Sequence, residues 1–358
     1  MDMDERDRLK IREVKSAVID MLEERKSLSG TCLSLFSPSK YWSDFCSFFD
    51  YMFTLPEECF GKLRLHTYHI TGDNYQRYYF GDIDEFMSAN DLIKLTKDIP
   101  NGYIINEPES GIGFTYAGKR FVSRDSIGCQ KIINNLYRYN VLGELGVGGK
   151  EKCLILEIGA GYGALAHHLS KIIGNCTYVI IDLPETLIFS GAYLSLLNAQ
   201  KNIYLYRREN YQKILRSKEI MAYDFVLLPN YILHSLEDLQ FALVISIASL
   251  QEMREDQVET YVNFIARNCK GLFYSSNRDR QPRNNELSNL SVLLREKFEV
   301  KEVTEKAEEI EKAKLSPRKL ALKLKKYLGC SNNIKRCSEG YSDFPYRECI
   351  CKPNRSNL

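Results

Sequence analysis

One stretch of the chain joins a hydrophobic run, a turn rich in glycine and the start of a helix. It reads Leu-Ile-Leu-Glu-Ile-Gly-Ala-Gly-Tyr-Gly-Ala-Leu over residues 154–165. Its glycines, Gly159, Gly161 and Gly163, let the chain reverse sharply and leave room for a ligand to approach the backbone. The helix that follows offers free N–H groups and the positive end of its dipole. The stretch therefore predicts a cofactor-binding loop.

The residues around the glycines favour one class of cofactor over another. The pattern Gly-x-Gly-x-x-Ala over 159–164 also satisfies the nicotinamide-dinucleotide fingerprint, which tolerates alanine at its third position. However, Glu157 precedes the first glycine by two residues, where its charge would repel a pyrophosphate but can pair with the ammonium of an amino acid. Gly163 gives a tighter turn. Both features favour S-adenosylmethionine, with Ala160 in the same loop, and a nicotinamide oxidoreductase is the alternative.

Two later strands are expected to end in side chains suited to the rest of that cofactor. The strand after the glycine loop ends at Asp182, whose carboxylate can accept hydrogen bonds from both ribose hydroxyls, and Leu183 can lie on the adenine face. The next strand ends at Asn230 and Tyr231, where an amide can contact the adenine edge. Asp182 could instead cap the helix that follows it. Its place after the glycine loop favours the ribose.

Several segments of the sequence resemble a known family, the sugar O-methyltransferases of surface-polysaccharide gene clusters. They are 154–195, Ser-Leu-Gln-Glu-Met at 249–253, Leu-Phe-Tyr-Ser-Ser-Asn-Arg at 272–278, and, near the amino terminus, 63–75. The glycine motif is common to all class I methyltransferases, whereas the Gln-Glu-Met segment points to this family. The chain departs from many class I enzymes at 241–243, which reads Phe-Ala-Leu where they carry Asp-Leu. The resemblance implies S-adenosylmethionine as cofactor and a sugar acceptor, either free, nucleotide-linked or in a glycan.

Methyl transfer to a sugar hydroxyl needs a group that accepts the hydroxyl proton, because a neutral hydroxyl is a weak nucleophile. Glu252 is the first candidate, since the strand 241–247 delivers it to the carboxyl edge of the sheet, where ligands of open α/β folds bind. A structural role at the start of a helix is equally compatible with its position. His66 and His69 are the next candidates. The residues expected to bind sugar hydroxyls or a nearby phosphate are Gln251, Asn277 and Arg278.

The elements that must position these residues change in character near residue 148. Before it, a helix over 7–26, an aromatic-rich segment interrupted by proline and glycine, and a helix over 126–142 predict an α+β domain that shapes the acceptor site. Beyond it, strand-length hydrophobic runs alternate with helical patterns. We therefore expect domains at 1–148 and 149–353, the second an α/β, Rossmann-like class I methyltransferase sheet with helices on both faces.

Two features of the second domain depart from a simple alternation. Alternating residues over 298–303 and 346–351 predict a final antiparallel pair that closes the sheet. Between them, a charged helical insertion is expected at about 304–340, and its basic part, 318–326, fits a solvated helix face better than an anion-binding surface.

Composition and charge argue against nucleic-acid binding, membrane insertion and secretion. Lys plus Arg is 49 and Asp plus Glu is 47, so a net charge of +2 gives no field that would gather nucleic acid. The longest hydrophobic run, 241–250, is about half of the roughly 20 residues that span a bilayer, and the charged start lacks a secretory core. We expect a cytoplasmic protein without a metal site, and a homo-oligomer is left open. The rival functions are methylation of another small molecule and a silent cofactor-binding module in a glycan-assembly complex.

Overall fold

The structure is a computed structural model, and it describes residues 3–28, 30–72, 75, 94–108, 123–146, 151–216, 218–303 and 346–354, without the side chains of residues 31–33, 124 and 218. The predicted insertion at 304–340, with its basic part, lies outside the described residues. So does the predicted domain boundary near 148. Within the described ranges, no helix has the length and hydrophobicity that crossing a membrane requires.

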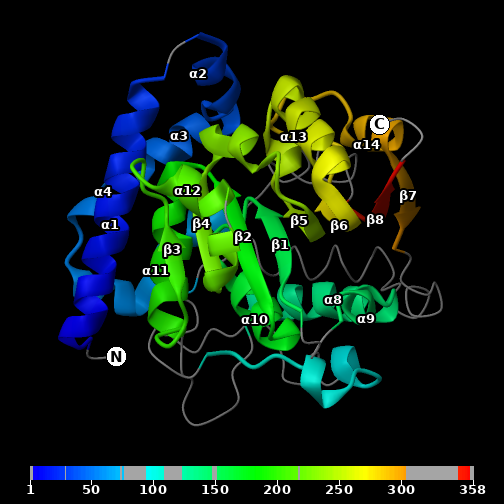
Figure 1. Cartoon of the computed structure of the whole chain (residues 1–358), viewed down its shortest axis with the longest axis horizontal. Coiled ribbons are helices and arrows are strands. Elements are labelled where there is room, and N and C mark those ends of the chain that lie inside the picture. The colour runs from blue at the N-terminus through cyan, green and yellow to red at the C-terminus, as the bar shows by residue number, and fades with distance from the viewer. Residues whose placement is uncertain are drawn as a thin grey trace, which may run out of the picture.

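A sheet of eight strands forms the centre of the described part of the chain, in the order β3-β4-β2-β1-β5-β6-β8-β7 (Figure 1). The strands are β1 (Cys153–Ile158), β2 (Cys176–Asp182), β3 (Ile203–Leu205), β4 (Phe225–Pro229), β5 (Phe241–Ile247), β6 (Cys269–Asn277), β7 (Phe298–Glu302) and β8 (Arg347–Pro353). Strands β1 to β6 pair in parallel, and β8 pairs antiparallel with both β6 and β7. The predicted α/β sheet and its closing antiparallel pair are confirmed. The short edge strand β3 was not predicted.

Helices cover this sheet on both faces. Those after the first strands are α10 (Ala164–Ile173), α11 (Pro184–Leu197), α12 (Tyr211–Arg216), η3 (Lys218–Ala222) and η4 (Asn230–Leu236), followed after β5 by η5 (Leu250–Glu252), α13 (Glu255–Asn268) and α14 (Leu290–Lys297). The chain moves from β1 to β2 toward one edge of the sheet and from β5 to β6 toward the other. Because such crossovers are right-handed, α10 and α13 lie on opposite faces.

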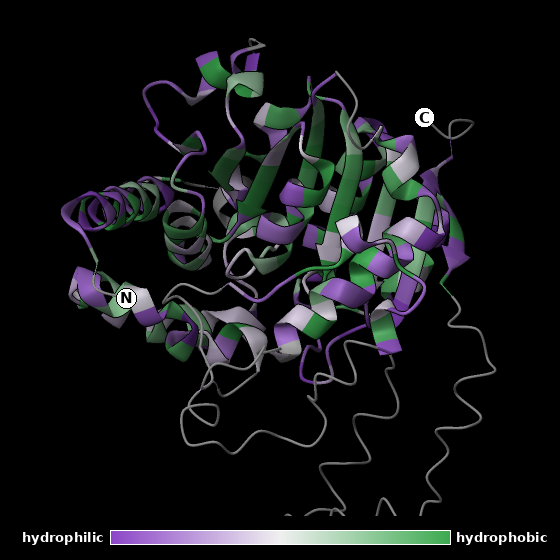
Figure 2. Cartoon of the chain, turned by 90° about the horizontal axis from the view of Figure 1, so that it is seen from below, coloured by the Kyte–Doolittle hydropathy of each residue, from purple (hydrophilic) through white to green (hydrophobic). Residues whose placement is uncertain are grey.

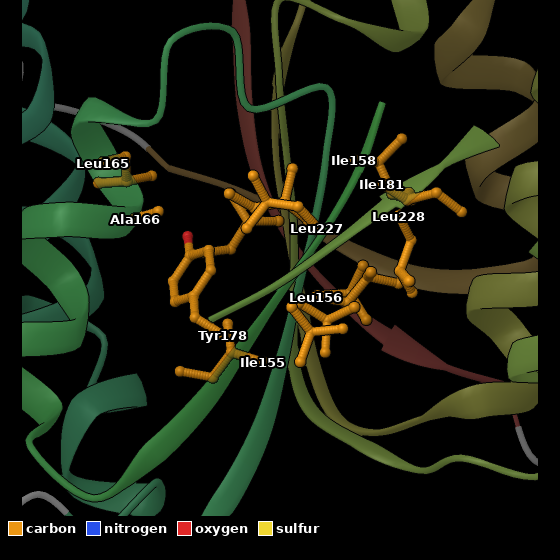
Figure 3. Close-up of a cluster of buried hydrophobic side chains, with 14 of the residues drawn as sticks. Ile155, Leu156, Ile158, Leu165, Ala166, Tyr178, Ile181, Leu227 and Leu228 are labelled. Carbon is orange, nitrogen blue, oxygen red and sulfur yellow. The ribbon is translucent and has the colours of Figure 1, made fainter. Parts of the chain in front are cut away.

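Burial on both faces explains the hydrophobic runs of the central strands. Figure 3 shows this core, with Ile155, Leu156 and Ile158 of β1, Tyr178 and Ile181 of β2, Leu227 and Leu228 of β4, and Leu165 and Ala166 of α10. All of β4 and most of β1 and β2 are buried. Figure 2 shows the same contrast, with hydrophobic strands inside and mixed helices outside. Such strands read as continuous apolar sequence because neither face meets water.

The amino-terminal part is helical in its described residues. It comprises α1 (Glu5–Lys26), α2 (Gly30–Phe36), α3 (Lys40–Phe48), α4 (Tyr51–Thr54), η1 (Glu57–His66), α5 (Tyr68–Thr71), η2 (Asn101–Tyr103), α8 (Arg124–Arg138) and α9 (Val141–Glu144). These residues contain no strand, so the α+β character expected here is not seen among them. The predicted helix over 126–142 is interrupted because Asn140 adopts a left-handed conformation, with φ of 58°.

Helix α1 packs along α11, which brings the amino-terminal part against the sheet. The two helices approach closely at Gly191, where a Cβ atom would lie 2.9 Å from Cγ1 of Val14. Near the other end of α1, the buried carboxylate of Glu185 accepts hydrogen bonds from the Arg25 guanidinium. Tyr231, at the end of β4, donates its hydroxyl proton to the Met21 carbonyl at 3.2 Å. Helix α1 is therefore held against the side of the sheet that contains β2 and β4.

Candidate functional site

A cavity of about 380 Å³ lies at the carboxyl ends of the parallel strands. Strand order reverses between β1 and β5, and ligands of open α/β sheets bind at such a point. Of the predicted cofactor residues, seven line the cavity, namely Glu157, Gly159, Ala160, Gly161, Asp182, Leu183 and Asn230. The predicted base Glu252 also lines it. These predicted residues therefore lie together around one cavity at this edge of the sheet.

The glycine loop has the conformation that its sequence predicts. Gly159, Gly161 and Gly163 have φ angles of +74°, +58° and +86°, which L side chains rarely adopt. A Cβ atom on Gly159 would lie 2.1 Å from Oγ of Ser249, so the loop after β5 packs directly on this glycine. Gly163 serves a different contact, because its Cβ would lie 3.3 Å from Leu194 of α11. It shapes the start of α10 and is not part of the cavity lining.

Glu157 is a buried carboxyl at the floor of the cavity, with 3% of its surface exposed. The Tyr178 hydroxyl donates a hydrogen bond to its Oε2 at 2.8 Å. Loss of hydration raises the pKa of Glu157 to about 8; the hydrogen bond from Tyr178 opposes that rise, and the charge of Asp182 adds to it. A cation in the cavity would favour the ionised carboxylate. The site therefore has a latent negative charge where the sequence predicts an ammonium partner.

Asp182 connects the end of β2 to the glycine loop. Its Oδ1 accepts a hydrogen bond from the Leu183 backbone N–H at 2.8 Å. Burial raises its pKa to about 6, against hydrogen bonds from the Thr186 hydroxyl and from the backbone N–H groups of Leu183, Gly161 and Ala160. The N-cap residue of α11 is Leu183, so Asp182 does not occupy that position. The carboxylate thus has a structural role in the loop and also lines the cavity.

Asn230 supplies a buried acceptor to the cavity wall. Its Nδ2 donates to the carbonyl of Phe36 at 2.8 Å, whereas its buried Oδ1 has no hydrogen-bond partner among the residues that the structure describes. A buried unsatisfied acceptor is costly, and a ligand N–H group such as the amino group of adenine would satisfy it. The neighbouring Tyr231 does not line the cavity, because its hydroxyl bonds to α1. Contact between Tyr231 and the cofactor stays a prediction.

Glu252 lies across the cavity in η5, at the end of the loop that follows β5. Its Oε2 accepts a hydrogen bond from the indole N–H of Trp42 at 2.9 Å. Burial raises the pKa of Glu252 to about 8; hydrogen bonds from Trp42 and Gln251 oppose the rise, and Asp182 adds to it. A carboxyl whose pKa lies near neutrality is suited to accept a proton at physiological pH. The position and environment of Glu252 are those of a candidate general base.

The amino-terminal segment 34–42 forms a wall of the cavity that sequence reasoning missed. Ser37, Pro38, Ser39 and Trp42 line the cavity. The bonds that fix the segment run from Gln257 to the carbonyls of Leu35 and Ser37, from Arg254 to that of Ser34, from Asn230 to that of Phe36, and from the Ser39 hydroxyl to the Glu252 carbonyl. The one sequence signal was Trp42, the single tryptophan of the chain.

A second missed residue is Asp125, in the first turn of α8. It lines the cavity, and its Oδ2 accepts a hydrogen bond from the hydroxyl of Tyr162 in the glycine loop at 2.8 Å. The hydroxyl of Tyr75 also donates to this oxygen, and the buried Arg64 contacts Tyr75 in turn. Four carboxyl residues, Asp125, Glu157, Asp182 and Glu252, therefore line the cavity. Among its described lining residues, none is Lys, Arg or His.

The remaining predicted residues lie behind the cavity wall. Gln251 accepts a hydrogen bond from the Arg278 backbone N–H at 2.7 Å, and the Asn277 side chain accepts one from the Ser249 backbone N–H at 3.0 Å. Asn277 also donates to the Ser246 carbonyl, and the Arg278 guanidinium lies 4.4 Å from the ring centre of Tyr346. These contacts position the loops after β5 and β6. Direct contact of these side chains with an acceptor stays a prediction, since none of them lines the cavity.

The two histidines expected near the acceptor also lie outside the cavity lining. Nδ1 of His66 is 3.1 Å from the Tyr51 hydroxyl, and the ring of His69 stacks on Phe48. Burial lowers the pKa of His66. The residues directly after His69, Ile70 and Thr71, do line the cavity, so this segment reaches the site with other side chains.

Comparisons with known proteins give matches among solved structures alone. No protein-family model matches the chain, and no curated protein does. The chain is similar to a precorrin-6y C5,15-methyltransferase from Geobacter metallireducens, with 15% identity, coverage of 53% of this chain and 79% of that chain, and a TM-score of 0.31. It is also similar to the N-methyltransferase NodS from Bradyrhizobium japonicum, solved with S-adenosyl-L-homocysteine, with 15% identity, coverage of 48% and 79%, and a TM-score of 0.30.

A third similar structure is an O-methyltransferase family protein from Burkholderia thailandensis, with 15% identity, coverage of 51% of this chain and 56% of that chain, and a TM-score of 0.30. The α/β fold itself follows from the order and pairing of the strands.

Proposed function

We propose that this chain is an S-adenosylmethionine-dependent O-methyltransferase that acts on a sugar hydroxyl. The observation that carries the proposal is the lining of the cavity, where four carboxyl groups and no cationic side chain are found among the described residues. S-adenosylmethionine carries a sulfonium and an ammonium and contains no phosphate. The pyrophosphate of a nicotinamide dinucleotide would find no cationic partner among these residues, and any ionised carboxylate would repel it. The cavity thus favours the first cofactor over the second.

The residues present fit that cofactor group by group. Glu157 would hold the ammonium, because its carboxyl is desolvated and gains most from a cationic partner. Asp182 would accept hydrogen bonds from the ribose hydroxyls, and Oδ1 of Asn230, which has no partner among the described residues, would accept one from the adenine amino group. Gly161 lines the cavity with a positive φ, and a Cβ atom there would lie 2.9 Å from Cγ2 of Ile70, so the loop has no room for a side chain at this point. When bound, S-adenosylmethionine supplies an electrophilic methyl group.

The chemistry left to the chain is the removal of a proton from the acceptor hydroxyl. Ionised Glu252 would accept that proton at Oε1 or Oε2, while the indole of Trp42 holds the carboxylate in place. Segment 34–42 forms the wall of the cavity beside this carboxylate. A positioned base of this kind contributes roughly 10²–10⁴-fold to the rate.

A sugar acceptor is supported by the resemblance of residues 249–253 and 272–278 to sugar O-methyltransferases. It is also supported by the hydroxyls of Ser39, Thr71 and Ser249, which line the cavity beside the carboxyls and can bond to a polyol. The lack of cationic side chains among the described lining residues favours a sugar that is free or within a glycan over a nucleotide-linked one. A cytoplasmic location and a homo-oligomer stay predictions.

Calorimetric titration tests the cofactor, and isotope transfer tests the reaction. We expect S-adenosylmethionine and S-adenosylhomocysteine to bind, and NAD⁺ and NADPH not to bind. Tritiated S-adenosylmethionine with a panel of monosaccharides and oligosaccharides should then yield labelled sugar. Binding of a nicotinamide dinucleotide alone would overturn the cofactor assignment. Label transferred only to other small molecules would overturn the sugar, and cofactor binding without transfer to any acceptor would indicate a silent module.

A further inference from the structure

A continuous row of aromatic rings leads from the cavity to the molecular surface. It starts at Trp42, which lines the cavity, and passes to Phe45, whose ring centre lies 5.5 Å from that of Trp42. Phe45 contacts His69 at 5.7 Å, and His69 stacks on Phe48 at 5.6 Å with an interplanar angle of 13°. Tyr68 contacts His69 edge to face at 5.4 Å. We call these five residues the aromatic strip.

The outer end of the strip is unusually open to solvent for such large rings. Phe48 is 58% exposed and Tyr68 is 53% exposed, whereas most described aromatic side chains are at least half-buried. The strip is built from two short elements, α3 and α5, that both also reach the cavity, through Trp42 and through Ile70 and Thr71. Clustered exposed hydrophobic side chains next to a ligand cavity mark a binding surface.

Exposed polar side chains lie next to the rings on α3. Asp44 precedes Phe45, and Ser47 precedes Phe48, and both polar side chains are exposed. A carbohydrate can contact both kinds of side chain, because one face of a pyranose ring presents C–H groups while its rim presents hydroxyls. The C–H face packs on an aromatic ring and the hydroxyls bond to carboxylate and hydroxyl groups.

We propose that the aromatic strip binds the inner sugar rings of an oligosaccharide acceptor whose terminal sugar enters the cavity. The inference rests on the proposed function, and it adds that the acceptor is a glycan chain of several sugars and not a free monosaccharide. The continuity of the rings from Trp42 to Phe48 is what joins the two sites. An acceptor chain that leaves the cavity on the α3 side meets stacking surfaces at each step.

The test uses the full chain on an array of immobilised oligosaccharides and matched monosaccharides, followed by solution titration with the best-binding oligosaccharide. Trp42 is the single tryptophan, so its fluorescence reports on the strip directly. Phe48→Ser and Tyr68→Ser should each weaken oligosaccharide binding by roughly 3–10-fold, the range expected for loss of one aromatic contact. Tyr68→Phe keeps the ring and should bind like the parent. Val292→Ser, on α14 and 55% exposed, is the control for loss of a surface hydrophobic group.

Each outcome decides the proposal. The role of the strip is overturned if both serine variants keep the parent's affinity for the oligosaccharide, or if only monosaccharides bind on the array. In either case the methyltransferase assignment still stands on cofactor titration and label transfer. Absence of binding to every glycan also overturns it. A serine variant that converts a dimer to a monomer in sedimentation velocity, with glycan binding unaffected, would show that the strip is an interface between copies of the chain. Failure of S-adenosylmethionine to bind the parent protein would overturn the proposed function itself.

Discussion

The indole nitrogen of Trp42 lies 2.9 Å from Oε2 of Glu252, although 210 residues separate them in the sequence. The contact joins the amino-terminal wall of the cavity to the loop that carries the candidate base. A second bond, from the Ser39 hydroxyl to the Glu252 carbonyl, fixes the same junction. The candidate base and the wall beside it are therefore held together, and changes on either side should affect the other.

Replacing Glu252 by glutamine should lower turnover far more than it weakens cofactor binding. The amide preserves shape and can accept the Trp42 hydrogen bond, but it does not take up the acceptor proton. If Glu252 is the base, kcat should fall by roughly 10²–10⁴-fold, with the Kd of S-adenosylmethionine nearly unchanged. Turnover within a few-fold of the parent enzyme would make Glu252 a structural residue, and His66 and His69 the next positions to replace.

Replacing Trp42 by phenylalanine tests the positioning of that base. The variant keeps an aromatic ring but removes the N–H that stabilises the ionised carboxylate, so the pKa of Glu252 should rise further above its present value of about 8. The ascending limb of the profile of log kcat against pH should shift to higher pH. Loss of activity without a shift of that limb would mean that Trp42 acts through packing alone. Tyr261→Phe, a cavity residue whose hydroxyl is removed without touching Glu252, is the matched control.

The sequence predicted the strands and the glycine loop well because both depend on local pattern. Strands that are buried on both faces appear in the sequence as continuous hydrophobic runs. Glycine is favoured at positions 159 and 161 because the backbone there has a positive φ angle. The edge strand β3 was missed because its three residues carry too short a pattern. Trp42 and Asp125 were missed for another reason, since tertiary packing of distant segments brings them to the cavity. Gln251 was placed at the correct sheet edge, but the direction of its side chain depends on loop contacts that no pattern encodes.

Cofactor binding should strengthen as pH rises toward 8. Glu157 has a pKa of about 8 in the free protein, so it is largely protonated below that pH, and a bound ammonium would favour the ionised form. Binding at pH 6 then requires loss of a proton, and binding at pH 9 does not. Calorimetry in buffers of different ionisation enthalpy should show proton release at pH 6 to 7 that disappears in Glu157→Gln. Affinity independent of pH in the parent protein would exclude Glu157 as the ammonium partner.

The same two glutamates predict how the stability of the unliganded protein depends on pH. Folding raises the pKa of Glu157 and of Glu252 from an ordinary value of 4.5 to about 8, so the folded state binds more protons than the unfolded state between these values. Stability should therefore be highest below about pH 4.5, as far as these two groups are concerned, and should fall as pH rises through 8. Thermal denaturation from pH 5 to 9 should show a decline in Tm that is smaller in Glu157→Gln/Glu252→Gln. An equal decline in that double variant would contradict the assignment.

Replacing Asp182 separates its two roles. Asp182→Ala should weaken S-adenosylmethionine binding by roughly 10–100-fold, because hydrogen bonds to a charged acceptor contribute about 1.5–3 kcal/mol. Asp182→Asn should lose less, since it keeps one acceptor oxygen. The carboxylate also accepts from the backbone of Leu183, so a loss of Tm in the absence of ligand measures the structural part. Thr186→Val removes the hydroxyl bond from Thr186 that favours ionised Asp182, and it serves as the control for loop geometry. If both Asp182 variants bind the cofactor like the parent and only Tm falls, the carboxylate holds the loop and does not contact the ribose.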